Sequence, residues 1–115
     1  MTDNELWPAA LDAVIAAPHH HTILLENDLV RVLDTRIEPG DKTPVHTHRW
    51  PSVYYIISFT DFVRRDAEGN VLVDTRQKPK GPTPKSIWSD PLPPHSLENV
   101  GDVAIHVVSV EIKGG

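Results

Sequence analysis

Two histidines, His46 and His48, end the segment Pro-Gly-Asp-Lys-Thr-Pro-Val-His-Thr-His at positions 39–48. On a β-strand alternate side chains share a face, so the two imidazoles would project into the same space. Neutral imidazole is a common ligand of transition metals, and this pair would supply half of a metal site. The alternative is two polar residues on the solvated face of a hairpin, and the H-x-H spacing alone does not choose between these readings.

The composition of the 115-residue chain narrows the functions to consider. Its length predicts one domain, 1–115, with a single core. The chain has no cysteine, which excludes disulfides, zinc-thiolate sites, iron-sulfur clusters and a cysteine nucleophile, and fits a reducing, cytoplasmic location. The acidic N-terminus and the interruption at Asp12 indicate neither a secretion signal nor a membrane span. A net charge of -5 without a basic run makes nucleic acid an unexpected partner.

The N-terminal region 1–21 is predicted to hold a helix and a connecting loop. Apolar residues recur at helical spacing over 4–16, with Asn4 as a cap, Pro8 in the first turn and Pro18 beyond the end. The three consecutive histidines at 19–21 are predicted to lie in a surface loop, because neighbouring side chains diverge and cannot easily meet at one ion.

The remainder, 22–113, has the pattern of an all-β barrel or sandwich, with short strands separated by turns. Residues 53–59 are apolar almost throughout, which predicts a strand covered on both faces. Prolines make 77–85 a long loop and 91–94 a turn. The strands are predicted at 22–25, 29–37, 53–59, 61–66, 71–75 and 103–112.

A second histidine motif gives the chain a family resemblance. Gly40 with His46-x-His48, followed by His95-x-x-x-Asn99, resembles the two signature motifs of the cupin superfamily, and the likeness extends over most of 29–112. The resemblance implies a cupin-type jelly-roll β-barrel (double-stranded β-helix), preceded here by the short N-terminal helix. It also implies that His46, His48 and His95 hold one divalent transition metal in the barrel mouth.

The sequence departs from the common cupin pattern where a glutamate ligand is expected. Those positions hold Ser52 and Val53, so the resemblance implies a three-histidine variant, similar to the thiol dioxygenases and the acetylacetone-cleaving dioxygenase. Fe(II) is favoured, with Zn, Mn, Ni and Cu as alternatives. Without an anionic ligand the metal would keep its double charge and attract an anionic, chelating substrate, but it would be retained less strongly.

Other side chains are candidates for substrate contacts or for support of the ligands. A strand arginine can clamp a carboxylate, and aromatic walls suit a small cavity; the candidates are Arg36, Trp50, Tyr55 (or its neighbour Tyr54) and Trp88. Asn99 and His106 are candidates for hydrogen bonds that support the ligands. The alternative for each is an ordinary core or surface role.

The predicted function is therefore a metal-binding cupin, most simply a dioxygenase-like enzyme acting on a small carbonyl- or oxygen-rich metabolite. No catalytic residue is assigned. The alternative is a non-catalytic module that binds a small molecule or metal, and a zinc hydrolase or isomerase is a lesser case. A homodimer is expected because 53–59 and 103–110 are apolar on both faces.

Overall fold

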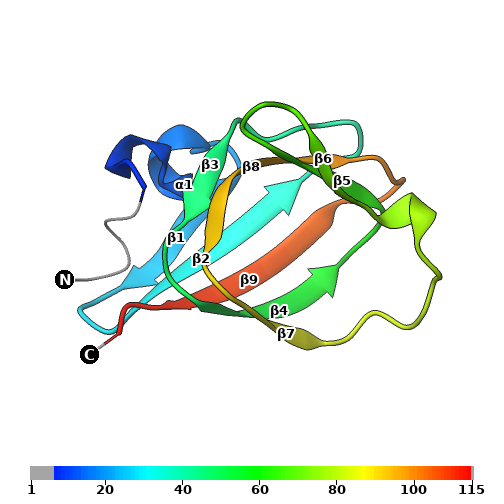
Figure 1. Cartoon of the computed structure of the whole chain (residues 1–115). Coiled ribbons are helices and arrows are strands. Elements are labelled where there is room, and N and C mark those ends of the chain that lie inside the picture. Colours follow the sequence, from blue (N-terminus) through cyan, green and yellow to red (C-terminus); the bar gives the residue numbers. More distant parts are fainter. Residues whose placement is uncertain (1–6, 115) are drawn as a thin grey trace.

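The computed structural model describes residues 7–114, which form two antiparallel sheets packed face to face (Figure 1). One sheet has the strand order β1-β2-β9-β4-β7 and the other β3-β8-β5-β6. The strands are β1 (His21–Glu26), β2 (Val30–Ile37), β3 (His46–His48), β4 (Ser52–Ser58), β5 (Phe62–Asp66), β6 (Val71–Asp74), β7 (Ser86–Ser89), β8 (Leu92–Asn99) and β9 (Ile105–Ile112). The all-β, jelly-roll prediction is confirmed, and the first strand starts at His21 rather than at residue 22.

The interior of the barrel changes from apolar to charged along its length. At one end Ile37 of β2 pairs with Ile105 of β9, and both belong to a small apolar cluster with Phe62. At the other end of the same two strands, Arg31 pairs with Glu111, and both are buried. Because alternate residues of paired strands share a face, this register places a charged pair and an apolar pair on one inner surface.

The predicted continuous helix over 4–16 is wrong for the part that the structure describes. A 3₁₀ turn, η2 (Ala9–Leu11), and a single α-turn, α1 (Ala13–Ala16), are separated by Asp12, whose backbone is extended with φ −55° and ψ 142°. Asp12 instead forms a parallel bridge with Thr47 and directs a buried carboxylate into the barrel. The interior ion pair overrides the local helical preference. The proposed cap, Asn4, lies outside the described residues.

The proline-rich region before the second histidine motif also differs from expectation. The turn predicted at 91–94 is the start of β8, which continues through Pro93 and Pro94. Its pairing with β3 is irregular between the His46–His95 and His48–Leu92 pairs. Proline lacks an N–H, so it is tolerated where the ladder of hydrogen bonds is already interrupted.

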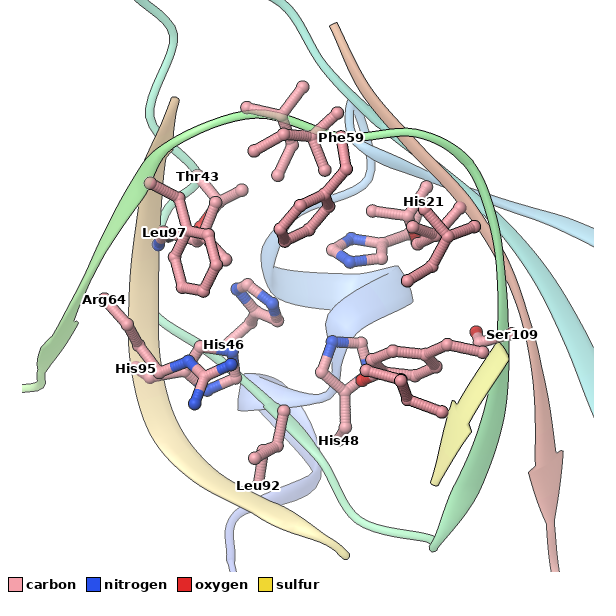
Figure 2. A pocket seen from close by; sticks show the side chains of 18 residues that line it. His21, Thr43, His46, His48, Phe59, Arg64, Leu92, His95, Leu97 and Ser109 are labelled. Carbon is pink, nitrogen blue, oxygen red and sulfur yellow. Dashed lines mark hydrogen bonds between the residues drawn. The ribbon is translucent and has the colours of Figure 1, made fainter. Parts of the chain in front are cut away.

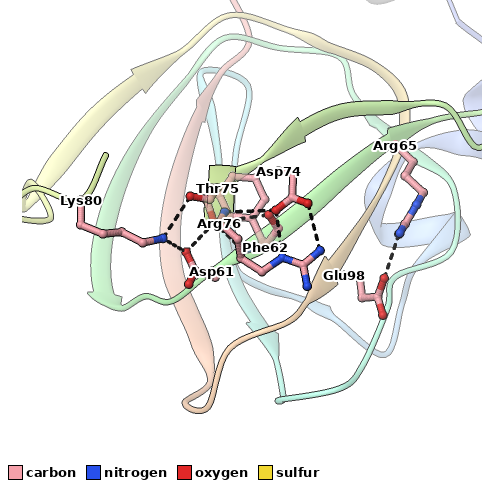
Figure 3. Close-up of polar contacts among 8 residues, drawn as sticks. All are labelled: Asp61, Phe62, Arg65, Asp74, Thr75, Arg76, Lys80 and Glu98. Atoms are coloured by element: carbon pink, nitrogen blue, oxygen red, sulfur yellow. Dashed lines mark hydrogen bonds and ion pairs between the residues drawn. The ribbon is translucent and has the colours of Figure 1, made fainter. Parts of the chain in front are cut away.

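The loop predicted over 77–85 is confirmed, apart from a short 3₁₀ turn, η3 (Thr75–Gln77), at its start. Lys80 ties this loop to the barrel by contacting the Asp61 carboxylate and donating to the Thr75 carbonyl oxygen at 3.0 Å (Figure 3). Within 7–114 there is no helix long and apolar enough to cross a membrane.

Candidate metal centre

Four buried histidines converge inside the barrel (Figure 2). His21 comes from β1, His46 and His48 come from β3, and His95 lies on β8 directly opposite His46. The ring centroid of His46 lies 4.5 Å from that of His95, 4.8 Å from that of His21 and 5.0 Å from that of His48. The structure therefore brings together the three predicted ligands and adds a fourth imidazole.

Each of these imidazoles has a hydrogen-bond partner at its Nδ1 atom. The acceptors for His21, His46 and His95 are the backbone carbonyl oxygens of Ala17, Pro44 and Pro93, at 3.0, 2.8 and 2.7 Å. The Nδ1 of His48 lies 3.2 Å from a carboxylate oxygen of Glu111. A carbonyl oxygen only accepts, so Nδ1 carries the proton and Nε2 keeps a lone pair. This arrangement is typical of metal-binding histidines, whose second nitrogen is held by an oxygen acceptor.

Burial keeps these histidines neutral at physiological pH. Desolvation, followed by the neighbouring imidazoles, lowers the pKa of His21 and of His48 to about 3 and that of His95 to about 2. Burial also lowers the pKa of His46. A neutral imidazole is the form that binds a metal, so the chemistry of this donor set fits a divalent transition ion.

The donor atoms of three of these histidines are close enough to share one ion, while the ring centroids of His48 and His95 lie 5.7 Å apart. The donor atoms of His21, His46 and His48 all lie within 4.8 Å of one another. His95 stands beside His46, so the predicted set of His46, His48 and His95 overlaps this one in two members. Neither residue at the expected glutamate position supplies a ligand. Ser52 donates to the Trp50 carbonyl oxygen at 3.3 Å, and Val53 is exposed on the outer face.

His21 is the main residue that sequence reasoning missed, because the surface-loop prediction for 19–21 treated the three histidines alike. His19 is exposed, His20 bonds the Asp41 carboxylate at 2.7 Å, and His21 starts β1 with only 5% exposure. Its pairing with Thr35 puts it on the inner face. The available signal was alternation: three adjacent histidines cannot share a face, but one of them can begin an inward-facing strand.

A chain of buried charges supports His48 from behind. The Arg31 guanidinium donates to both oxygens of Asp12, at 2.8 and 3.0 Å, and its Nε donates to Glu111 at 2.6 Å. Glu111 in turn accepts from His48. Burial raises the pKa of Glu111 although Arg31 opposes this, whereas for Asp12 the bonds and charge of Arg31 outweigh burial and lower the pKa.

A cavity of about 130 Å³ opens beside the histidines. Its walls are mainly apolar, with Ile37, Ile56, Phe59 and Phe62 among them, and within residues 7–114 Arg64 is the one lining residue with a permanent charge. No aspartate or glutamate lines the cavity in the described part of the chain. The site therefore combines lone pairs from neutral imidazoles with a cationic wall.

None of the four predicted substrate contacts lines this cavity. Arg36 lies on the outer face, where its Nε donates to the Glu38 carboxylate at 2.6 Å. Trp50 is buried, and the Cζ atom of Arg31 lies 4.9 Å from the centroid of its ring. Tyr55 and Trp88 are exposed, and their neighbours Tyr54 and Ile87 line the cavity instead. Adjacent residues on a strand lie on opposite faces, so Tyr54, the alternative named with Tyr55, and Ile87 face the cavity while Tyr55 and Trp88 face outward.

The two predicted supporting residues also lie elsewhere. His106 is on the outer face, where its Nε2 is 2.7 Å from the Asp34 carboxylate. Asn99 is fully buried, and its amide nitrogen donates to the carbonyl oxygens of Ile37 and Val103 while its oxygen accepts from Gly101 N–H. Asn99 therefore holds the backbone around it and has no hydrogen bond to a candidate ligand.

Solved structures share this arrangement of strands. A cupin domain from Bordetella pertussis has 24% identity, with 82% of this chain and 92% of that chain covered and a TM-score of 0.62. The fold is that of the cupins. A double-stranded β-helix protein from Klebsiella pneumoniae has 20% identity, coverage of 83% and 76% and a TM-score of 0.57. A predicted oxalate decarboxylase from Thermotoga maritima has 22% identity, with 82% of this chain and 79% of that chain covered and a TM-score of 0.51.

The cupin likeness is one of structure. No protein-family model and no curated protein matches the sequence. At these identities the likeness establishes the fold, and any activity has to be argued from the site itself.

The lowered histidine pKa values predict that the metal-free protein loses stability on mild acidification. The unfolded chain binds protons as the pH falls below about 6.5, while the folded histidines stay neutral, so the unfolding free energy falls. The expected loss is about 1 kcal/mol per pH unit for each such histidine, measured by urea denaturation between about pH 7 and pH 5.5.

Two variants isolate the contribution of the buried histidines to this slope. His21→Gln should reduce the slope, whereas His19→Gln, at an exposed position, should leave it unchanged. A stability that is flat over this pH range in the parent protein would contradict the assignment of buried, neutral imidazoles.

Proposed function

We propose that this cupin binds one divalent transition metal through His46, His48 and His95, with His21 available as a fourth ligand, and uses it in a dioxygenase-like reaction. The observation that carries the proposal is that all four imidazoles have their Nδ1 atoms engaged and line the same cavity. The substrate class that fits is a small carbonyl- or oxygen-rich metabolite, because the cavity is small.

Fe(II) is the proposed metal, with Zn, Mn, Ni and Cu as alternatives, because neutral imidazoles suit all of these ions. When bound, such an ion would supply Lewis acidity to a substrate oxygen and, in the case of iron, redox activity toward oxygen. The chain contributes the remaining features. Glu111 orients His48 and increases its basicity, Arg31 holds Glu111 in place, and the apolar walls limit the access of water.

One observation favours a non-catalytic binding module as the second candidate. His21 supplies a fourth imidazole, and a tetrahedral zinc ion bound by all four imidazoles would have no position for a substrate. In a zinc enzyme one of the four histidines would therefore stay unbound or be displaced, whereas a six-coordinate Fe(II) would keep positions for substrate and oxygen beside four imidazoles. The two candidates therefore differ in the role of His21.

Metal content is the first test of the proposal. Protein prepared without an affinity tag and loaded with Fe(II) or Zn under exclusion of oxygen should retain about one ion per chain after gel filtration. His46→Ala should lose at least ten times in metal affinity, whereas His19→Ala, outside the cluster, should keep it. Parent protein without stoichiometric metal would contradict the ligand assignment.

Oxygen consumption separates the enzyme from the binding module. The iron-loaded protein should consume oxygen with at least one member of a panel of diketones, thiols and hydroxy acids, and His48→Ala should abolish this. A raised melting temperature with the same compounds but no turnover would support the binding module instead. If His21 blocks the substrate position, His21→Ala should raise turnover. If His21 is needed to hold the metal, the variant should lose both the metal and the oxygen consumption.

A homodimer is also proposed, because the outer face of the five-stranded sheet is apolar in the single chain. A row of paired residues crosses all five strands of this face: Leu25, Val32, Val110, Val53 and Trp88. Val53, Tyr55 and Ile57 are exposed, so the prediction that their strand is covered on both faces fails for one chain alone. A second copy would cover it.

The cytoplasmic location stays a prediction from the cysteine-free sequence.

Light scattering coupled to gel filtration tests the dimer directly. The parent protein should elute with twice the mass of one chain, and Val53→Lys should reduce this to one chain by placing a charge in the apolar row. Val71→Lys, at an exposed position on β6 of the other sheet, is the matched control and should remain dimeric. A monomeric parent protein would contradict the proposal.

A further inference from the structure

Arg64 lies on the wall of the histidine cavity, on the inner face of β5. It alternates with Phe62, another cavity residue, and pairs with Leu97 of β8, two residues beyond His95. Figure 2 shows its side chain beside His95. A positive charge therefore stands next to the candidate ligands, at a position that the cupin motifs of the sequence do not include.

Within residues 7–114 the guanidinium of Arg64 has no hydrogen-bond acceptor or ion-pair partner, and its one aromatic contact is with the Phe62 ring, whose centroid lies 5.7 Å from Cζ. Its Nε is buried without a hydrogen-bond acceptor, and it forms no ion pair. Arg31, Arg36, Arg65 and Arg76 each pair with a carboxylate. Arg49 also lacks an acceptor at Nε, but it lies outside the cavity and stacks on the Trp50 ring at 4.4 Å. A partly buried cation without an acceptor is costly, and burial lowers the pKa of Arg64. Such a group is expected where a ligand supplies the missing acceptor.

The opposite wall holds a second buried donor in the same condition. The Ser109 hydroxyl, on β9 of the other sheet, lines the cavity and has no hydrogen-bond partner among the described residues. With no acidic residue lining the cavity and four neutral imidazoles between the two walls, the protein leaves donors and positive charge unmatched there. A ligand that bears a negative charge and accepts hydrogen bonds would satisfy both walls.

We propose that the cavity binds a small organic carboxylate, with the carboxylate group held by Arg64 and a second oxygen of the same molecule directed at the histidines. The contact with Arg64 stands without a metal; the role of the second oxygen rests on the proposed function. A volume of about 130 Å³ is below the ~300 Å³ of typical ligand sites and has room for about four water-sized groups. A hydroxy or keto acid of two or three carbons fits this space.

Calorimetric titration of the full chain, in metal-free and in zinc-loaded form, tests the proposal with glycolate, its uncharged counterpart glycolamide, and inorganic phosphate. The parent protein should bind glycolate at least tenfold more tightly than glycolamide in both forms, as expected for a charge-assisted contact. Equal affinities for glycolate and glycolamide, binding of phosphate alone, or no binding of glycolate at millimolar concentration would each overturn the proposal.

Two substitutions of Arg64 and one of its neighbour assign the selectivity to a residue. Arg64→Met should weaken glycolate binding about tenfold or more and leave glycolamide unchanged, while Arg64→Lys should recover part of the loss. Arg65→Met is the matched control, because Arg65 points to the other face and pairs with Glu98 at 2.8 Å (Figure 3). Glycolate affinity within twofold of the parent in Arg64→Met would overturn the proposal.

Zinc content measured on the same samples separates this inference from the proposed function. Arg64→Met should keep its zinc, since Arg64 is not a ligand. Selectivity for glycolate in a protein that retains no metal would uphold the carboxylate site and reject the metal centre. Stoichiometric zinc without selectivity for glycolate would uphold the metal centre and reject the carboxylate site.

Discussion

The buried guanidinium of Arg31 is the interaction on which the rest of this barrel depends. It carries a permanent charge at 3% exposure, and it is accommodated because Asp12 and Glu111 accept from three of its nitrogens. These bonds join the N-terminal turns, β2 and β9 at the end of the barrel that holds the histidines. Loss of either carboxylate would leave a buried charge without compensation, at a cost of about 3–5 kcal/mol. The extended backbone at Asp12, which interrupts the predicted helix, is a consequence of this requirement.

The same network sets the charge balance of the candidate metal centre. The common cupin glutamate is absent from the ligand positions, but Glu111 places a carboxylate behind His48, and Asp12, Arg31 and Glu111 together carry one net negative charge in their ionised forms. A divalent ion at the histidines would therefore be only partly neutralised, and Arg64 adds a further positive charge on the cavity wall. The cavity is lined by neutral donors and one cation, so a bound metal ion would add to a positive charge that no lining carboxylate balances. This excess positive charge would attract the proposed carboxylate ligand.

Local pattern in the sequence predicts the strands and the His46–His48 pair, because alternation on a strand is a local property. In β2, the alternate residues Arg31, Leu33 and Ile37 share a face, and all three are buried there. The errors arise where long-range pairing decides the outcome. His21 becomes a cluster member through its register with Thr35, and Arg31 meets Glu111 across 80 positions of sequence. Tyr54 rather than Tyr55 faces the cavity because the register of β4 against β9 fixes the face. Arg64 carries no local signal, because its significance is the absence of a partner in three dimensions.

X-ray absorption spectroscopy of the zinc-loaded protein tests most directly the claim that these imidazoles share one ion. The account predicts a coordination shell of nitrogen at about 2.0–2.1 Å with the multiple scattering of at least three imidazoles. His95→Ala should remove one imidazole from that shell or abolish binding, and His21→Ala should do the same where the parent shell contains four imidazoles. A shell dominated by water or carboxylate oxygen, with fewer than two imidazoles, would contradict it.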